Sequence, residues 1–306
     1  MTEQAQEIYG IVNVYKEKGY TSHDVVAVVR KMLGGVKAGH TGTLDPAAEG
    51  VLPICLGKAT KIAEYLAAET KGYVAVLNLG RTTDTDDETG REIFRKPVDS
   101  TEEEINAAVR RFQKDYWQIP PMYSAIKMDG KKLYELARQG KTAERQARLV
   151  YIYKLKIMEF MPDHKIRLDI LCSKGTYIRS LCRDIGDALG CGGNMGHLLR
   201  VSSGQFNLAD SIKLPEMEQL VKDGKFTERL ITIEQALSDY PRVRLNARGD
   251  KYLHNGNKIS SHYIEGHGLG LNERQQVLVY DSTRRLGGLY ELSADMDALK
   301  PMTMLL

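Results

Sequence analysis

The order of strand-like and helix-like segments in the first 238 residues limits the fold more than any other feature of the sequence. Alternating runs rich in β-branched residues predict strands at 8–16, 72–80, 149–160 and 165–172. Amphipathic patterns predict helices at 23–33, 58–69 and 176–190. These segments do not follow a repeating βα unit, which a doubly wound parallel sheet requires. The order therefore predicts an α+β fold with a mixed β-sheet and flanking helices.

Two helix starts carry capping signals. Thr21 or Ser22 can cap the helix at 23–33. Ser100 and Glu103 have the spacing of a capping box, which predicts a further helix through Phe112.

The pattern of strand-like and turn-forming residues changes near residue 238. Beyond it, short alternating runs such as PRVRLNARG and GGLYELS are separated by glycine and asparagine turns. This pattern predicts a small all-β domain. A length of 306 residues also favours two domains, since a domain typically takes about 150 residues. We therefore predict a first domain at 1–238 and a second at 239–306.

Cysteine content, the N-terminal residues and the length of the apolar runs argue against a secreted protein or a membrane protein. The net charge is only +3, so any nucleic-acid partner must be recognised by local clusters of basic residues. The four cysteines form no CxxC pair, and the polar N-terminus is unlike a signal peptide. No apolar run approaches the roughly 18 residues that a membrane span needs. We expect a cytoplasmic protein with reduced thiols and no membrane association.

The common cofactor motifs are absent or broken. Residues 50–59 resemble a Walker A loop, but six residues rather than four separate its glycines, and Ala59 follows Lys58. The acidic turn at 84–95 has Thr89 where a calcium loop has glycine, and Arg95 where it has glutamate. The histidines form no HExxH motif. We expect neither a metal nor an organic cofactor.

The stretch GHTGTLDPAAEGVLPICLGKAT at 39–60 places one carboxylate in a crowded turn. Pro46 fixes its own φ and favours an extended Asp45, while Gly42 and Gly50 permit close backbone approach. A carboxylate held in this way suits a nucleophile, because its geometry is set before the substrate arrives. The alternative is a structural turn in which Asp45 hydrogen-bonds its own backbone. On the residues of this stretch alone, the structural turn is the better-supported interpretation, because aspartate before proline is common in loops.

Four stretches together resemble one known family. They are the stretch at 39–60, KGY at 71–73, QIPPMYSAIKMDGKKLYELARQG at 118–140 and CSKGTYIRSL at 172–181. In this order they are similar to the motifs of the bacterial tRNA pseudouridine-55 synthase family, TruB. The resemblance implies a pseudouridine synthase fold and isomerisation of the uridine at position 55, in the T-loop of tRNA. That reaction needs no cofactor.

The resemblance also implies the chemical roles of three residues. Asp45 matches the catalytic carboxylate, and Arg179 matches the arginine that pairs with it and would keep it ionised. The target uridine must leave the RNA stack, and Tyr73 matches the tyrosine that offers it a stacking face.

Three further matches concern the base pocket and the opening of the RNA. Tyr177 matches a tyrosine that contacts the substrate, and Leu198 matches a leucine that lines the pocket. His40 matches a histidine that wedges into the RNA as the base leaves. Ordinary packing accounts equally well for Tyr177 and Leu198.

Basic residues are concentrated in two regions that the resemblance assigns to RNA binding. The first is an insertion at about 122–150 with seven basic residues, Lys127, Lys131, Lys132, Arg138, Lys141, Arg145 and Arg148. The second is the C-terminal domain, which resembles a PUA-like RNA-binding domain and offers Arg242, Arg244, Arg248, Lys251 and Lys258. We expect tRNA, through its T-arm stem-loop, to be the partner of a monomer with no obligate protein partner.

Two other functions remain as alternatives. A tRNA-folding chaperone would need the basic insertion and His40 but not Asp45. A guide-RNA-dependent pseudouridine synthase subunit would need lysine-rich tails and protein-docking segments, which this chain lacks.

Overall fold

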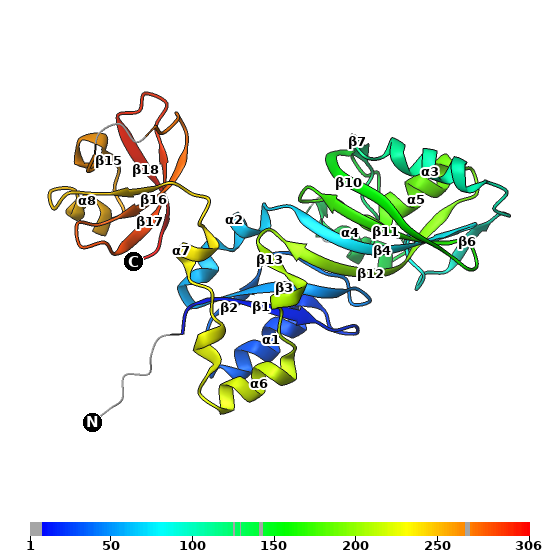
Figure 1. Ribbon diagram of the computed structural model, residues 1–306, viewed down its shortest axis with the longest axis horizontal. Coiled ribbons are helices and arrows are strands. Elements are labelled where there is room, and N and C mark those ends of the chain that lie inside the picture. The colour runs from blue at the N-terminus through cyan, green and yellow to red at the C-terminus, as the bar shows by residue number, and fades with distance from the viewer. Residues whose placement is uncertain (1–7, 125, 129, 141–142, 267–269) are drawn as a thin grey trace.

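The computed structural model describes residues 8–124, 126–128, 130–140, 143–266 and 270–306. Figure 1 shows an elongated body, which contains more than the first three quarters of the chain, and a C-terminal domain at one end of it. The body has two halves on a shared sheet. One half carries α1 (Ser22–Met32) and α6 (Leu214–Lys222), and the other carries α3 (Glu102–Arg111) and α5 (Ile178–Ala188).

A nine-stranded mixed sheet runs through the body. Its main strand order is β1-β3-β12-β4-β11-β10-β7, with β2 paired to β3 and β13 paired to β12. The strands are β1 (Gly10–Lys16), β2 (Ala38–His40), β3 (Glu49–Leu56), β4 (Lys71–Leu79), β7 (Asp115–Gln118), β10 (Arg148–Met161), β11 (Lys165–Cys172), β12 (Gly193–Ser203) and β13 (Phe206–Asn207). The predicted mixed sheet with flanking helices is confirmed.

One parallel contact joins the two halves of this sheet. β12 pairs with β3 in parallel at Leu199–Glu49 and Arg200–Gly50, whereas the other pairs of the sheet are antiparallel. Gly50 has φ of +105°, and a Cβ there would lie 2.2 Å from the carbonyl oxygen of Arg200. Only glycine permits this approach. The contact brings the start of β3, and the turn before it, against β12.

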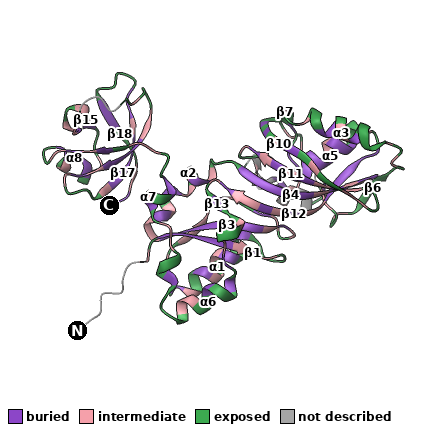
Figure 2. Ribbon diagram, in the orientation of Figure 1, coloured by how far each residue is buried: buried purple, intermediate pink, exposed green. Residues whose placement is uncertain are grey.

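Short elements complete the body. They are the 3₁₀ turn η1 (Gly57–Ile62), α2 (Ala63–Ala67), β5 (Arg81–Thr83), β6 (Glu92–Arg95), β8 (Lys127–Met128), β9 (Lys131–Lys132), α4 (Leu133–Arg138), η2 (Leu208–Asp210), η3 (Phe226–Arg229) and α7 (Ile233–Ala236). The segment predicted as one helix at 58–69 is therefore a 3₁₀ turn followed by a short α-helix. Figure 2 shows buried residues along the strands and exposed residues on the outer sides of the helices.

The helix caps agree with the sequence in one case and differ in the other. Thr21 caps α1 in a capping box with Asp24. For α3 the cap is Thr101 with Glu104, so the predicted pair Ser100 and Glu103 is wrong by one residue. Thr101 has the extended backbone of a cap residue, and its side chain accepts a hydrogen bond from the N–H of Glu104.

The C-terminal domain contains a five-stranded sheet in the order β14-β16-β17-β18-β15. Its elements are β14 (Arg242–Arg244), α8 (Asp250–His254), β15 (Ile259–Ser260), η4 (Ser261–Tyr263), β16 (Gln276–Tyr280), β17 (Leu286–Leu292) and β18 (Ala298–Met304). The all-β prediction omitted the short helix α8. The domain packs on the body, because Leu278 and Leu289 share an apolar cluster with Ile62 and Leu66.

Candidate active site

The turn that carries Asp45 connects β2 to β3. The N–H of Ala48 donates to the carbonyl oxygen of Asp45 at 3.0 Å, which closes a four-residue turn with Pro46 in its second position. The Asp45 carboxylate does not bond this turn. Its oxygens face Arg179, with Nε 2.9 Å from Oδ2 and Nη2 3.3 Å from Oδ1. The alternative of a self-bonded structural turn is therefore wrong.

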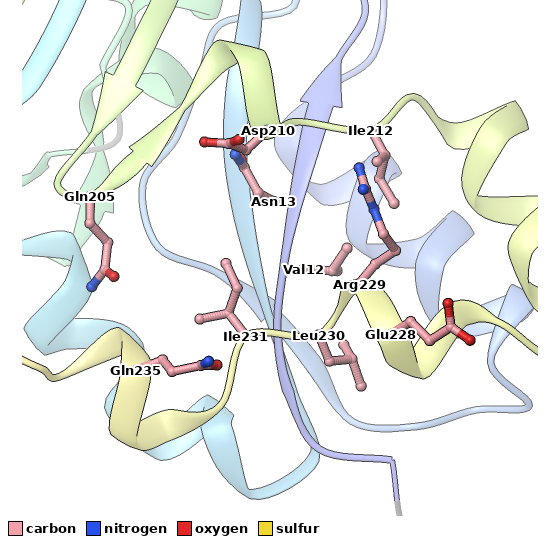
Figure 3. Close-up of a pocket in the computed structure, with 10 residues that line it drawn as sticks. All are labelled: Val12, Asn13, Gln205, Asp210, Ile212, Glu228, Arg229, Leu230, Ile231 and Gln235. Carbon is pink, nitrogen blue, oxygen red and sulfur yellow. The ribbon is translucent and has the colours of Figure 1, made fainter.

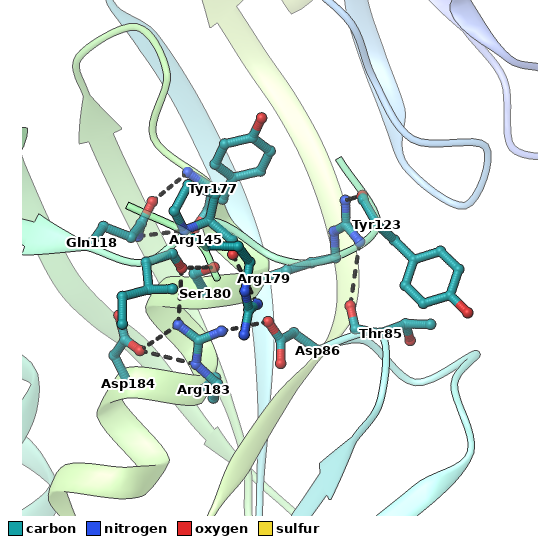
Figure 4. A network of polar contacts seen from close by, with 12 residues as sticks. Thr85, Asp86, Gln118, Tyr123, Arg145, Tyr177, Arg179, Ser180, Arg183 and Asp184 are labelled. Carbon is teal, nitrogen blue, oxygen red and sulfur yellow. Dashed lines mark hydrogen bonds and ion pairs between the residues drawn. The ribbon is translucent and has the colours of Figure 1, made fainter. Parts of the chain in front are cut away.

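Arg179 is the second residue of α5, and only 6% of its side chain is exposed. Besides Asp45, its guanidinium donates to the carbonyl oxygen of Tyr123 at 2.8 Å and to that of Thr85 at 3.2 Å. The carboxylate of Asp87 lies 3.9 Å from Nη1. Figure 4 shows Arg179 reaching from α5 toward Thr85 and Tyr123. A planar guanidinium with this many partners fixes both the position and the orientation of Asp45.

The electrostatics of Asp45 suit a reactive carboxylate. Burial raises the pKa of Asp45, and the nearby Asp87 carboxylate adds to this, while Arg179 opposes it. The side chain is nevertheless 36% exposed, so one edge of the carboxylate is open to a ligand. Asp45 can therefore act on a bound ligand as a nucleophile or as a stabilising charge.

Lys16, which the sequence analysis did not select, supports the turn that carries Asp45. It lies at the end of β1 and has no exposed surface. Its Nζ donates to the carbonyl oxygens of Tyr20 at 2.7 Å, Glu17 at 3.2 Å and Pro46 at 3.3 Å. Burial lowers the pKa of Lys16 to about 8, against the attraction of Asp45. A buried cation thus ties the turn to the end of β1.

Ser22, the first residue of α1, holds the turn from the helix side. Its hydroxyl donates to the carbonyl oxygen of Leu44 at 3.1 Å and accepts from the N–H of Leu44 at 2.8 Å. Leu44 directly precedes Asp45, so this pair of bonds fixes the backbone at the reactive residue.

Arg200 is a second buried cation that the sequence analysis did not select. It is 1% exposed and lies on β12, opposite Gly50. Its guanidinium donates to the carbonyl oxygens of Val51 at 2.7 Å, Gly42 at 3.2 Å and Thr43 at 3.4 Å. These bonds hold the chain on both sides of Asp45. An alternating strand pattern gives no signal for such a role, because a strand arginine usually faces solvent.

Tyr73 and Leu198 belong to the same apolar cluster as Leu44, the residue before Asp45. Tyr73 is on β4, paired with Arg200 across the sheet, and is 8% exposed. Burial raises the pKa of Tyr73 to about 12, so its hydroxyl stays protonated at neutral pH. Leu198 is 7% exposed and pairs with Ala75. The structure thus brings both predicted residues to the Asp45 side of the sheet.

Tyr177 occupies the cap position of α5, two residues before Arg179. Its backbone makes two hydrogen bonds to the side chain of Gln118, at 2.8 Å and 3.1 Å. The ring is partly buried, and burial raises the pKa of its hydroxyl. Tyr177 therefore sits beside Arg179 on a firmly held backbone.

His40 ends β2 and packs edge-on against His23, with ring centroids 5.2 Å apart. Its Nδ1 is buried, and no described residue hydrogen-bonds it. Burial lowers the pKa of His40 to about 4, with His23 and Arg200 adding to the effect. A neutral ring suits stacking or wedging rather than proton donation.

The N-terminal part of α5 clamps the chain segment that leads into the insertion. Ser180 Oγ donates to the carbonyl oxygen of Ile119 at 3.0 Å, and Arg183 Nη2 donates to the same oxygen at 3.1 Å. Arg183 also pairs with the carboxylates of Asp86 at 2.7 Å and Asp184 at 2.8 Å. Figure 4 shows these side chains converging on one side of α5.

The structure describes the side chains of only some of the predicted RNA-binding residues of the insertion. Lys141 lies outside the described residues, and only the backbone is described for Lys127, Lys131, Lys132 and Arg138. Arg145 turns inward and donates from Nη1 to the carbonyl oxygen of Pro120 at 2.9 Å. Burial lowers the pKa of Arg145, and the nearby Arg183 adds to this. Arg148 is exposed at the start of β10.

A separate cavity of about 460 Å³ lies beside β1, on the edge of the strand that hydrogen-bonds the backbone of Ile212 and Ile231. Figure 3 shows side chains around it from β1, from the segment after β13 and from the region before α7. None of the predicted site residues lines this cavity. Its size alone therefore does not identify the reactive site, which is marked by the Asp45–Arg179 pair.

The described residues contain no group of three or more His, Cys, Asp or Glu side chains placed to hold a metal ion. All four cysteines are buried and free. None of the described helices is long and apolar enough to cross a membrane.

Comparison with known proteins was consistent across sequence and structure. A family model described as "TruB family pseudouridylate synthase (N terminal domain)" matches residues 30–178. A second, described as "tRNA pseudouridylate synthase B C-terminal domain", matches residues 179–238.

Curated relatives extend over nearly the whole chain. The tRNA pseudouridine synthase B of Lachnoclostridium phytofermentans is 44% identical over 305 residues, covering 97% of this chain and 99% of that protein. The protein of the same name from Alkaliphilus oremlandii is 49% identical over 255 residues, covering 83% of this chain and 84% of that protein.

Solved structures share the fold. The chain is 27% identical, with a TM-score of 0.76, to a chain of a Cbf5-Nop10-Gar1 complex, covering 97% of this chain and 85% of that one. A chain of an H/ACA RNP bound to a substrate RNA containing 2'-deoxyuridine is 25% identical, with a TM-score of 0.73 and the same coverage.

Proposed function

Because this chain belongs to the TruB family of pseudouridylate synthases, we propose that it isomerises one uridine in the T-loop of tRNA, position 55, with Asp45 as the catalytic carboxylate. The family predicted from the sequence motifs is confirmed. The activity itself, conversion of uridine to pseudouridine in tRNA, follows from relatives of that name over almost the full length of the chain. The T-loop position and the roles of individual residues are our proposal.

The reaction exchanges one bond to the ribose for another. The bond between N1 of uracil and C1′ of ribose breaks, the base rotates, and a bond from C5 to C1′ forms. The proton on C5 is lost, and N1 gains a proton, so the overall change is an isomerisation. Asp45 either attacks the substrate or stabilises the charge that develops during this exchange.

The other site residues position Asp45 and the base. Arg179 lowers the pKa of the Asp45 carboxyl against the effect of burial, and it holds both carboxylate oxygens in a fork. Tyr73 offers an uncharged ring for stacking, and Leu198 and Tyr177 border the same space. His40, neutral above about pH 4, replaces the departing base in the RNA stack.

One observation carries this proposal. Asp45 is held on both oxygens by a nearly buried arginine, yet 36% of its side chain remains open. A structural ion pair has no need of an open edge. A catalytic carboxylate requires one, because the extruded base must reach it.

The RNA partner is proposed on the basis of charge and family. Binding of the T-arm would use the insertion at about 122–150 and the C-terminal domain, with the protein acting as a cytoplasmic monomer without an obligate protein partner. The guide-dependent alternative receives less support, since the relatives named tRNA pseudouridine synthase B are 44–49% identical to this chain. The structures titled as Cbf5 or H/ACA complexes reach only 24–27%.

The test is incubation of purified protein with an unmodified T-arm stem-loop, without metal or ATP, followed by mapping of pseudouridine. Conversion of the single T-loop uridine supports a stand-alone enzyme. Binding without conversion would favour the chaperone or the guide-dependent alternative. Conversion at a different uridine would disprove the proposed position.

A further inference from the structure

The backbone of His40 is firmly held, but its ring is not held by a hydrogen bond at Nδ1. His40 is the last residue of β2 and lies opposite Ile54 of β3. The N–H of the next residue, Thr41, donates to the carbonyl oxygen of Pro53 at 3.1 Å. The ring Nδ1 is buried, and no described residue hydrogen-bonds it. A ring that replaces a base in a stack needs a defined orientation, so some other contact must supply it.

Charge does not fix the His40 ring either. Burial lowers the pKa of His40 to about 4, and the nearby His23 and Arg200 add to this effect. The ring is therefore neutral at pH 7 and forms no ion pair there. A neutral ring of this kind is oriented by packing against its neighbours.

The neighbour that meets the His40 ring is His23. The two ring centroids lie 5.2 Å apart, and the ring planes are at 88° to one another. This is the T-shaped arrangement that aromatic pairs prefer, with the edge of one ring against the face of the other. Such a partner limits how far the His40 ring can turn. It does not cover the ring completely, because His40 is only half-buried.

His23 is itself held in place by the first turn of α1. The capping box of Thr21 and Asp24 closes around it in the sequence. Ser22, the residue directly before His23, exchanges two hydrogen bonds with the backbone of Leu44, at 2.8 Å and 3.1 Å. His23 therefore lies between anchored residues, although its own side chain is exposed.

The rest of α1 packs on the strands that carry His40. Val25 and Val29 of α1 are fully buried in one apolar cluster with Ile54, the residue opposite His40. Ala38, the first residue of β2, packs against the same cluster. A closely packed core resists displacement of its elements. The spacing between His23 and His40 is therefore set by the fold before any RNA binds.

We propose that His23 is a positioning residue for His40, whose ring it holds in the orientation that enters the RNA stack as the target uridine leaves. The inference rests on the proposed function, because His40 has this role only if a base is extruded. Ser22 holds the backbone before Asp45, and the next residue holds the His40 ring. One turn of α1 therefore supports both the reactive carboxylate and the residue that displaces the base.

The test measures base extrusion and conversion separately. An unmodified T-arm stem-loop carries 2-aminopurine beside the target uridine, and its fluorescence rises when the neighbouring base unstacks. Stopped flow mixes it with saturating wild type, His23→Ala, His23→Phe or Lys31→Ala, so that differences in affinity do not enter, and pseudouridine is quantified in parallel. Lys31 is exposed in the last turn of α1 and controls for general changes in the helix. The Tm of each variant checks that it is folded.

We expect extrusion to slow about fivefold in His23→Ala, as for the loss of one aromatic pair. His23→Phe keeps an aromatic ring without polar atoms, so it should recover most of the rate. Lys31→Ala should extrude the base at the wild-type rate. In a His40→Ala background, His23→Ala should cause no further loss, because the two residues act as one unit.

Three results would overturn the inference. Equal losses for His23→Ala and His23→Phe would assign to His23 a polar contact of its own with the RNA. A further loss in the His40→Ala background would show that His23 acts independently of His40, and wild-type extrusion by His23→Ala would show that the ring needs no support. A failure of the proposed function would appear differently, as wild-type protein that binds the stem-loop without a rise in fluorescence and without conversion.

Discussion

The two sides of the Asp45 site are held in place by different kinds of interaction. On the turn side, Lys16 and Arg200 are almost completely buried, and each donates hydrogen bonds to backbone carbonyl oxygens. On the α5 side, Arg179 and Arg183 make ion pairs with Asp45, Asp86 and Asp184, and also hold carbonyl oxygens of the segment at 119–123.

This difference matches what each side has to do. Removing a buried cation from several carbonyl oxygens leaves them unsatisfied, so the turn side is costly to rearrange. The ion pairs of the α5 side are largely buried too, with 6% of the Arg179 side chain and 16% of the Arg183 side chain exposed, so breaking one of them leaves an uncompensated charge. We infer that the turn side fixes the backbone at Asp45, whereas the α5 side fixes the charge and orientation of its carboxylate.

Among the residues that hold Asp45 in place, the largest effect should come from the arginine that joins the two sides. Arg179→Met leaves the Asp45 carboxylate without its partner, and we expect kcat to fall by about 10² to 10³. Arg179→Lys keeps the charge but not the paired geometry, so it should recover only part of this loss. Single-turnover conversion of tRNA measures both variants. Full activity of Arg179→Met would show that the pair does not position a catalytic group.

A smaller but clear effect on stability is expected on the turn side. Lys16→Met keeps the apolar stem and removes the three bonds to carbonyl oxygens, which should lower the free energy of unfolding by about 2–4 kcal/mol. Denaturant unfolding at pH 7 provides the measurement. Lys18→Met, an exposed neighbour, is the matched control and should change stability by less than about 0.5 kcal/mol. Equal stabilities of the two variants would mean that Lys16 does not support the turn.

On the α5 side, loss of Arg183 should affect substrate binding more than chemistry. Arg183→Gln removes the ion pairs with Asp86 and Asp184 and the bond to Ile119, which hold the segment that leads into the insertion. We expect KM for tRNA to rise about tenfold, with kcat changing less than about twofold. Steady-state kinetics separates the two, with the exposed Arg111→Gln of α3 as control. A fall in kcat at unchanged KM would assign Arg183 to the support of Asp45 instead.

The smallest effect concerns His40 and pH. Its pKa is about 4 in the folded protein and about 6.5 when unfolded, so the unfolded chain binds the extra proton first on acidification. Stability should therefore fall as the pH decreases from about 6.5 to 4, by about 1 kcal/mol at pH 5.5 from this group. His40→Gln should lose this part of the pH dependence in denaturant unfolding, and exposed His262→Gln should retain it. An unchanged pH profile for His40→Gln would contradict a neutral, buried His40.

Several helices and strands could be predicted from the sequence pattern, whereas one cap position and one strand pairing could not. Period-2 and helical patterns located β1, β4, β10, β11, α1 and α5, because these elements bury one continuous face. The cap of α3 was misplaced by one residue, since Ser100 and Thr101 both precede a glutamate by three positions. The close backbone approach at Gly50 was expected, but the sequence does not show that β12 is the strand that pairs with β3 there.

For the site, the family motifs identified Asp45 and Arg179, but the supporting cations were missed. Lys16 ends a strand and is followed by a polar loop, and Arg200 lies in an alternating strand, so both resemble ordinary surface residues. Their role depends on carbonyl oxygens from Tyr20, Pro46 and Gly42, which come together only in the folded chain.

The central claim is that the Asp45 carboxylate, held on a rigid turn, carries out the isomerisation. Single-turnover pseudouridine formation by Asp45→Asn on unmodified tRNA tests it most directly, with tRNA affinity measured on the same protein. We predict that affinity stays within about twofold of wild type while the rate falls by about 10⁴ or more. Conversion by Asp45→Asn at a rate near that of the wild type would contradict the account.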